Sequence, residues 1–327
     1  MSETTEKCCV NEDLAPKYIL SLDGGGIRGY FIWELLMKIK NQIGQCPQDT
    51  FDLFVGTSIG GLISLVLAQH TNCDPECKLQ SFFTRENMDT IFNKSIWDKL
   101  LGYAQFCPLY DGVGKRKVIV KHMSCLKMGD IKEKVALTTW NMSSFSPVVF
   151  KSYEEAHADI SVADVADATS AAPIYFPAVE INEQYYLDGG VAANNPIFVA
   201  YTEARKLWPN NPLYILSIGT CLEPMEQEWS TSRIKGWGAP QWFNNGIVDI
   251  LMDAPCSTML DEVEKLMSLH PSHKLLRLNG TIPRIQMDDC DNDSLRILRD
   301  TADRVWRTEQ TRIEQFFEPK IKEINER

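Results

Sequence analysis

Short apolar runs alternate with helical patterns along most of the chain. The run YILSLD predicts a buried strand, and YFIWELLMKIK behind it predicts a helix with an apolar stripe at Phe31, Leu35 and Ile39. FDLFVG predicts a second strand, and LISLVLAQ, which is apolar on nearly all sides, predicts a buried helix. Alternation of strands with helices is typical of a largely parallel sheet that carries helices on both faces.

The rest of the chain continues this alternation. We expect helices near residues 77–84 and 86–100, and strands at KVALTTWNM, SPVVFKS, QYYLDGG, PLYILSIGT and HKLLRLNGTI. The segment NNPIFVAYTEARKLW predicts a helix with Asn195 as its N-cap and Pro196 at its first helical position. A charged helix is expected at residues 292–325, broken at Pro319.

These elements predict the fold class and the domain organisation. The chain has no internal repeat, low-complexity segment or clear linker. We therefore expect one domain over residues 17–327, with a helical region at its C-terminal end, behind a flexible tail at residues 1–16. The expected architecture is α/β: a three-layer sandwich with a mainly parallel central sheet and helices on both faces.

The composition is that of an ordinary soluble globular protein, with 44% hydrophobic and 24% charged residues among 327. The net charge of −11 argues against nucleic acid as a partner. No apolar run approaches the roughly 20 residues that span a bilayer, and the polar N-terminus lacks the apolar region of a signal peptide. We therefore expect a cytoplasmic protein with free thiols, whose contact with membranes is peripheral.

Two local clusters of polar residues are candidate sites. Cys73 and Cys77 in HTNCDPEC resemble half of a zinc site, but no second pair follows at the required spacing. We therefore expect thiols there and no metal centre. A basic cluster, interpreted as a solvated face, comprises Lys115, Arg116, Lys117 and Lys121.

The segment VGTSIGG places Gly56-x-Ser58-x-Gly60 between an apolar strand and a buried helix. In that context the pattern is typical of a nucleophile elbow, because glycines relieve the clashes of the strained turn. The elbow would hold the Ser58 hydroxyl clear of the sheet, at the positive N-terminus of the following helix. The competing interpretation is a small-residue turn that only packs helix on strand.

A serine nucleophile needs a base, and the chain offers two kinds. Histidine is the usual partner, but no histidine lies at an evident strand end, and we interpret His270 and His273 as solvated residues of a surface connection. Asp188 follows a strand and precedes Gly189 and Gly190, which would allow a close approach of backbone or substrate. An aspartate is a poor base unless burial raises its pKa, so Asp188 is either a base or a turn residue.

The segment LDGGGIRG follows the first strand and carries Gly24, Gly26 and Gly29 at the GxGxxG spacing of a dinucleotide site. Such a site needs an acidic residue at the end of the next strand, where this chain has Gly-Thr-Ser, and a P-loop lysine is absent. The turn instead predicts an oxyanion hole. Its donors would be the backbone amides of Gly25, Gly26, Ile27 and Ile59.

In this order the three motifs resemble those of the patatin-like phospholipases, whose members share a glycine-rich oxyanion turn, a Gly-x-Ser-x-Gly elbow and an Asp-Gly-Gly. Here these are Gly24–Gly29, Gly56–Gly60 and Asp188–Gly190. The segments ATSAAPIYFPAV, GGVAANNPIFVAYTEA and WFNNGIVDILMDAPCSTMLDEVEKLM also look like this family, closest to the plant-type patatins. The resemblance covers roughly residues 17–280.

The resemblance implies a lipid acyl hydrolase that cleaves acyl esters of phospholipids or other glycerolipids. Ser58 would be acylated and Asp188 would act as the base, without a catalytic histidine, a metal or an organic cofactor. Arg28 stands where the family often carries a basic residue, and it would either steady the turn or meet a lipid phosphate. The glycines that would support the motifs are Gly24, Gly29, Gly56, Gly60, Gly189 and Gly190.

Two alternatives stay open. An α/β-hydrolase esterase would use Ser58, Asp188 and either His270 or His273, although that fold places several strands before its elbow and here only one is expected. A catalytically silent relative would bind lipid or a partner protein instead. Transient membrane contact would need apolar surface residues, and the candidates are Trp97, Leu100, Leu101 and the segment GWGAPQWF (236–243).

Overall fold

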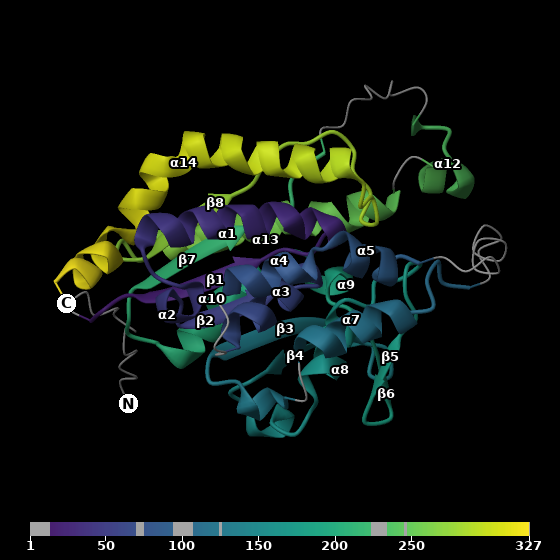
Figure 1. The fold of residues 1–327 in the computed structure, drawn as a ribbon, viewed down its shortest axis with the longest axis horizontal. Coiled ribbons are helices and arrows are strands. Elements are labelled where there is room, and N and C mark those ends of the chain that lie inside the picture. Colours follow the sequence, from purple (N-terminus) through teal and green to yellow (C-terminus); the bar gives the residue numbers. More distant parts are fainter. Residues whose placement is uncertain are drawn as a thin grey trace, which may run out of the picture.

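The computed structural model describes residues 14–69, 75–93, 107–123, 126–223, 234–244 and 247–326 (Figure 1). Its strands form one eight-stranded sheet in the order β5-β6-β3-β2-β1-β7-β8, with β4 beside β3. Five strands run parallel to one another: β1 (Lys17–Leu22), β2 (Leu53–Gly56), β3 (Lys134–Asn141), β7 (Leu213–Ile218) and β8 (Lys274–Leu278). The prediction of a mainly parallel sheet is confirmed.

Three strands pair antiparallel at one side of the sheet. They are β4 (Ser146–Lys151), β5 (Val179–Ile181) and β6 (Gln184–Asp188). β5 is short and was not predicted from the sequence, whereas the other two match the expected strands. The antiparallel strands matter for the site, because they bring the chain back toward the carboxyl ends of the parallel strands.

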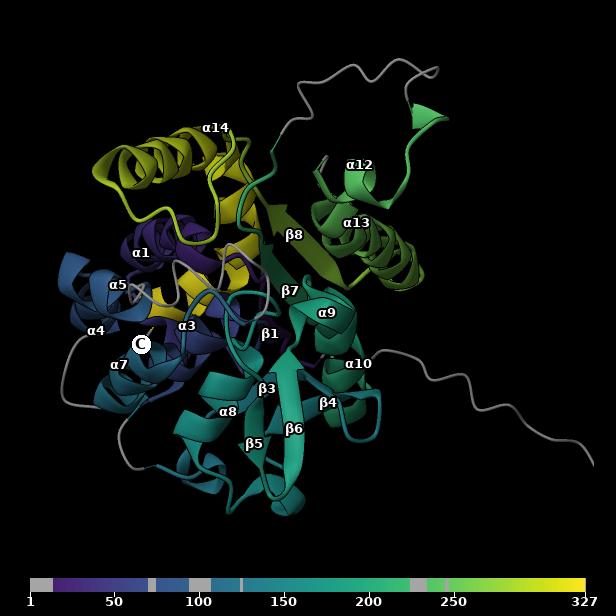
Figure 2. The ribbon, with the colours of Figure 1, turned by 90° about the vertical axis from the view of Figure 1, so that its right-hand side faces the viewer.

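Helices cover both faces of the sheet, as Figure 2 shows. One face carries α1 (Gly29–Ile43), α3 (Ile59–Ala68) and α14 (Asn292–Asn325), and the other carries α10 (Ile197–Leu207) and α13 (Ile247–Ser268). Successive side chains of a strand point to opposite faces, so Leu20 belongs to the first core and Ile19 to the second. The predicted three-layer sandwich is therefore confirmed.

Shorter helices complete the molecule on both sides of the sheet. They are α2 (Pro47–Thr50), α4 (Pro75–Phe82), α5 (Arg85–Ile91), α7 (Val113–Met123), α8 (Val162–Thr169), α9 (Gly190–Ala193) and α12 (Ala239–Asn244). α4 and α5 correspond to the two helices expected near 77–84 and 86–100, although residues 94–100 lie outside the described residues. Within the described ranges, every helix is too short or too polar to cross a bilayer.

Two details of the helices differ from the prediction. α10 begins at Ile197, so Pro196 is the N-cap residue, and the Asn195 side chain accepts a hydrogen bond from the Ile197 amide at 3.0 Å. α14 continues through Pro319, and the predicted break there is wrong. Phe316 and Phe317, just before the proline, are buried against Tyr18, and this packing offsets the lost backbone hydrogen bond.

The docking of α14 predicts a large effect of Phe317→Ala. Phe317 is fully buried, stacks on Tyr18 with ring centroids 5.8 Å apart and meets Phe51 edge-on at 6.0 Å. We expect the truncation to lower the free energy of unfolding by about 3–5 kcal/mol, measured by denaturant titration. Phe198→Ala is the matched control, because Phe198 is 43% exposed. Equal losses in the two variants would contradict the docking of α14.

Candidate active site

The carboxyl ends of β2 and β6 meet on one edge of β3. β4 pairs with residues 136–141 of β3, so it occupies one edge of that strand. β2 pairs with residues 134–137 and β6 with residues 139–141, so both must occupy the other edge, one after the other. Because β2 is parallel to β3 and β6 is antiparallel, their last residues, Gly56 and Asp188, face each other across about two residues of β3, or ~7 Å.

Ser58 lies in this gap, on a strained turn between β2 and α3. Its φ of 54° and ψ of −124° lie outside the regions that non-glycine residues favour, as a nucleophile elbow requires. The Ser58 amide donates to the Thr169 hydroxyl at 3.2 Å, and its carbonyl accepts from the Leu62 amide in the first turn of α3. The side chain is thus presented at the helix N-terminus, as the sequence predicted.

The glycines beside Ser58 are required by close backbone approaches. A β-carbon at Gly60 would collide with the carbonyl oxygens of Leu22 and Asp23 at the end of β1. A β-carbon at Gly56 would collide with the carbonyl oxygen of Gly60 itself. The motif therefore lets α3 press directly onto the end of β1, which brings Ser58 beside the glycine-rich turn.

Asp188 is buried, with 4% of its surface exposed, and its carboxylate accepts a hydrogen bond from the Gly190 amide at 2.7 Å. Burial raises the pKa of Asp188 to about 6, although the nearby Ser58 hydroxyl, the Gly190 amide and the charge of Lys115 act in the opposite direction. A β-carbon at Gly189 would collide with Thr138 on β3. The Asp-Gly-Gly motif thus holds a carboxylate against the serine with a pKa close to neutral.

The glycine-rich turn lies directly over Ser58. A β-carbon placed on Gly24 would come within 3.2 Å of the Ser58 β-carbon, and Gly26 has a φ of 58°, which favours glycine. Within the described chain, the amides of Gly25, Gly26 and Ile59 donate to no protein acceptor. These three amides are available to a bound oxygen.

Two neighbours of the turn correct or refine the sequence analysis. The Ile27 amide donates to the Met287 carbonyl at 2.9 Å. Because this amide is already hydrogen-bonded, the prediction that it is an oxyanion donor is wrong. Arg28 forms an ion pair with Glu223 at 3.2 Å, and its Nε reaches the Gly25 carbonyl at 3.4 Å. Arg28 therefore steadies the turn, which is one of its two expected roles. Gly29 packs against Ile59.

A buried ion pair under the turn was missed by the sequence analysis. The guanidinium of Arg277, on β8, binds both carboxylate oxygens of Asp23, at 2.9 and 2.5 Å, and donates to the Ser217 hydroxyl at 2.7 Å. Asp23 is 5% exposed, and burial raises its pKa while Arg277 opposes the rise. The Thr220 hydroxyl donates to the Gly24 carbonyl at 2.6 Å. The ion pair and the Thr220 hydroxyl thus fix the start of the turn. The sequence did not reveal this ion pair, because Arg277 lies over 250 residues away from Asp23 in the chain.

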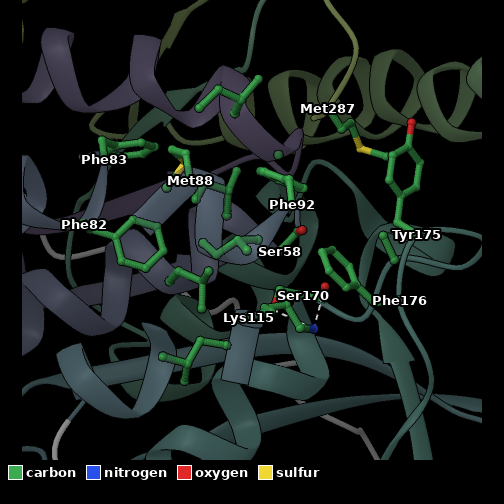
Figure 3. Close-up of a pocket in the computed structure, with 17 residues that line it drawn as sticks. Ser58, Phe82, Phe83, Met88, Phe92, Lys115, Ser170, Tyr175, Phe176 and Met287 are labelled. Carbon is green, nitrogen blue, oxygen red and sulfur yellow. Dashed lines mark hydrogen bonds between the residues drawn. The ribbon is translucent and has the colours of Figure 1, made fainter. Parts of the chain in front are cut away.

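An apolar cavity opens beside Ser58. Its walls come from the glycine turn, from α3, α5 and α7, from the end of α4 and from the loop that precedes β5. Figure 3 shows aromatic and methionine side chains around the serine, with Lys115 at the cavity wall. The larger apolar lining residues are Phe82, Phe83, Met88, Phe92, Tyr175 and Phe176. The apolar lining of the cavity suits an aliphatic group, and Ser58 is part of its wall.

His270 and His273 lie far from Ser58. His273 is buried rather than solvated, because its Nδ1 accepts a hydrogen bond from the Leu213 amide at 3.1 Å, and burial lowers its pKa to about 4. Leu213 is at the amino end of β7 and Ser58 follows the carboxyl end of β2, about 17 Å along the sheet. His270 packs against His273, with ring centroids 5.0 Å apart. Neither residue reaches the Ser58–Asp188 pair.

Other predicted residues fall partly outside the described part of the chain. Trp97, Leu100, Leu101 and Cys73 lie there, and the side chain of Cys77 does too, so the thiol prediction is not addressed. In the segment 236–243, Trp237 and Trp242 are half-buried and pack edge-to-face with ring centroids 4.9 Å apart.

Comparison with known proteins adds to this geometry. Residues 20–201 match the family model for "Patatin-like phospholipase". "Patatin-like protein 2" of Arabidopsis thaliana is 28% identical over 90% of this chain and 84% of its own length. A "cGAMP-activated phospholipase" of Vibrio cholerae is 34% identical over 67% of each chain. Among solved structures, VipD from Legionella pneumophila aligns over 90% of this chain and 67% of its own, with 12% identity and a TM-score of 0.43.

The buried ion pair predicts a pH-dependent loss of stability in Arg277→Met. The variant leaves Asp23 buried without its counter-ion, so we expect a loss of about 3 kcal/mol at neutral pH in chemical denaturation. The folded state then binds a proton more tightly than the unfolded one, so the loss shrinks as the pH falls toward about 4. The double variant Asp23→Asn/Arg277→Met has no such charge and should lack this pH dependence. A pH-independent loss in Arg277→Met would contradict the assignment.

Proposed function

Because the chain belongs to the patatin-like phospholipase family, we propose that it hydrolyses acyl esters of phospholipids or other glycerolipids with Ser58 as nucleophile and Asp188 as base. The observation that carries this proposal is the buried Asp188 carboxylate next to Ser58 where the ends of β2 and β6 meet, with Ser58 in the wall of an apolar cavity. An ester whose acyl chain fills the cavity would place its carbonyl at Ser58.

In the first step the Ser58 oxygen attacks the ester carbonyl carbon, and its proton passes to the Asp188 carboxylate. The carbonyl oxygen becomes an oxyanion, for which the free amides of Gly25, Gly26 and Ile59 are the proposed donors. The bond to the glycerol oxygen then breaks, and protonated Asp188 returns the proton to this leaving group. The products of the step are an acyl-enzyme on Ser58 and a lysolipid or other alcohol.

In the second step water attacks the acyl-enzyme and gives a proton to Asp188. The same amides would hold the second oxyanion, and the proton returns to Ser58 as the fatty acid leaves. A carboxylate with a pKa of about 6 suits both directions of transfer, because it is ionised at neutral pH and still basic enough to accept a proton.

Substrate in a lipid aggregate requires contact between the cavity mouth and the lipid surface. Ile174 is 61% exposed and has a φ of 76°, which is strained for a β-branched residue. It is followed directly by Tyr175 and Phe176, which line the cavity. We include transient, peripheral contact of this loop with lipid in the proposal.

The proposal is tested by lipid analysis. Wild type and Ser58→Ala are incubated with mixed glycerolipid vesicles, and released fatty acids and lysolipids are identified by mass spectrometry. The assay is run with and without cGAMP, which is the activator in the name of the bacterial relative. We expect release and fluorophosphonate labelling with wild type only. A folded wild type that neither releases fatty acid nor takes the label would favour a catalytically silent relative.

The role of Asp188 predicts the effect of Asp188→Asn. This variant keeps the shape of the side chain but cannot accept the serine proton, so kcat should fall by about 1,000-fold or more while the thermal unfolding midpoint stays close to wild type. Near-normal turnover in Asp188→Asn would show that Asp188 is only a turn residue.

The pKa of Asp188 predicts an acid limb in the pH profile. Below a pH of about 6 the carboxylate is protonated and cannot act as base, so kcat/KM should fall about tenfold per pH unit there and level off above it. The measurement uses a soluble short-chain ester, and circular dichroism checks folding across the range. The double variant His270→Ala/His273→Asn should keep this limb. Loss of the limb in that variant would favour a histidine base.

A further inference from the structure

Lys115 was expected in a solvated basic cluster, and the structure contradicts this. The side chain is 4% exposed and lies at the wall of the cavity beside Ser58 (Figure 3). Arg116 next to it pairs with Asp164 and, at 3.7 Å, with Asp167. Burial of an ammonium group costs free energy unless its N–H groups donate hydrogen bonds. The contacts of Lys115 therefore show which segment it stabilises.

Four oxygens surround the Lys115 ammonium group. The Asp167 carbonyl lies at 2.9 Å, the Asp167 carboxylate at 2.9 Å, the Ser170 carbonyl at 3.0 Å and the Ser170 hydroxyl at 3.4 Å from Nζ. The group also lies 4.6 Å from the centre of the Phe176 ring. Both carbonyls belong to the C-terminal end of α8, where helix carbonyls lack partners and a cation is favourable.

The segment that Lys115 holds touches both proposed catalytic residues. We call residues 167–171 the α8 strap. Within it, the Thr169 hydroxyl accepts the Ser58 amide at 3.2 Å and donates to the Thr138 carbonyl at 2.7 Å. The Ala171 carbonyl accepts the Asp188 amide at 3.0 Å. A shift of the strap would therefore move the backbone of Ser58 and of Asp188 together.

We propose that Lys115 is a positioning residue for the Ser58–Asp188 pair: it fixes the α8 strap against both residues and contributes a positive charge to the surroundings of the Asp188 carboxylate. The proposal rests on the proposed function. It adds a third ionisable group to the site, drawn from α7 and not from any of the three sequence motifs.

The charges around Asp188 set the direction of the expected effect. From α3 it receives the Ser58 hydroxyl, from its own turn the Gly190 amide, and from α7 the charge of Lys115. Each of these lowers the pKa of Asp188 against the rise that burial causes. Lys115 itself forms an ion pair with Asp167, and Asp167 also pairs with Arg116. Removal of the Lys115 charge must therefore raise the pKa of Asp188.

The test is the pH profile of kcat/KM on a soluble ester in Lys115→Met. We expect the acid limb to move up by about one pH unit, so that activity falls about fivefold more at pH 6 than at pH 8. Lys115→Arg keeps the charge and should keep the limb near its wild-type position. Lys117→Met is the matched control, because Lys117 is an exposed lysine of the same helix and its loss changes the net charge equally. A purely structural role would lower activity at all pH values without moving the limb.

Should Lys115→Met fail to fold, Lys115→Met/Asp167→Asn is read in its place, because it removes the whole ion pair and leaves no uncompensated carboxylate at that site. An unmoved limb in the folded variant, or an equal shift in Lys117→Met, would overturn the proposal for Lys115. The two proposals can fail separately. A wild type without esterase activity or fluorophosphonate labelling refutes the proposed function. An active wild type whose acid limb stays in place in Lys115→Met refutes only this inference.

Discussion

The head-on meeting of β2 and β6 along one edge of β3 is the constraint on which the site depends. Neither β2 nor β6 pairs with Thr138 of β3, so the hydrogen-bond ladder along this edge is interrupted next to Ser58 and Asp188. Threonine hydroxyls fill the interruption: Thr57 and Thr138 share a hydrogen bond of 2.6 Å, and Thr169 donates to the Thr138 carbonyl at 2.7 Å. The gap is therefore rigid and still leaves room for a serine and a carboxylate.

Two buried cations support this junction. Arg277 holds Asp23 at the start of the glycine-rich turn, and Lys115 holds the end of α8, where the Ala171 carbonyl binds the Asp188 amide. Such pairs contribute little net stability, because desolvation offsets most of the attraction, but breaking either one leaves a charge buried alone. Their value at this place is geometric: each fixes backbone that lies within contact of Ser58 or Asp188.

The sequence predicted the features whose causes are local. Alternating periodicity revealed the sheet and its two helical layers, and the glycines near Ser58 reflect clashes within a few residues of the chain or with the adjacent strand end. What it missed depends on distant partners. Arg277, Thr169 and the buried state of Lys115 become meaningful only when β8, α8 and α7 are packed, and the aromatic contacts of Phe317 carry α14 past Pro319. The Ile27 amide is occupied by a carbonyl 260 residues later in the chain, which no local pattern encodes.

The strand order has a consequence for protein synthesis. The glycine-rich turn and Ser58 lie within the first 60 residues, but β1 is flanked by β7, and Asp23 forms its ion pair with Arg277 on β8. A ribosome must therefore release nearly the whole chain before the turn acquires its neighbours and its counter-ion. A chain truncated before β8 therefore carries the glycine-rich turn and Ser58 without the strand and the counter-ion that hold the turn in place.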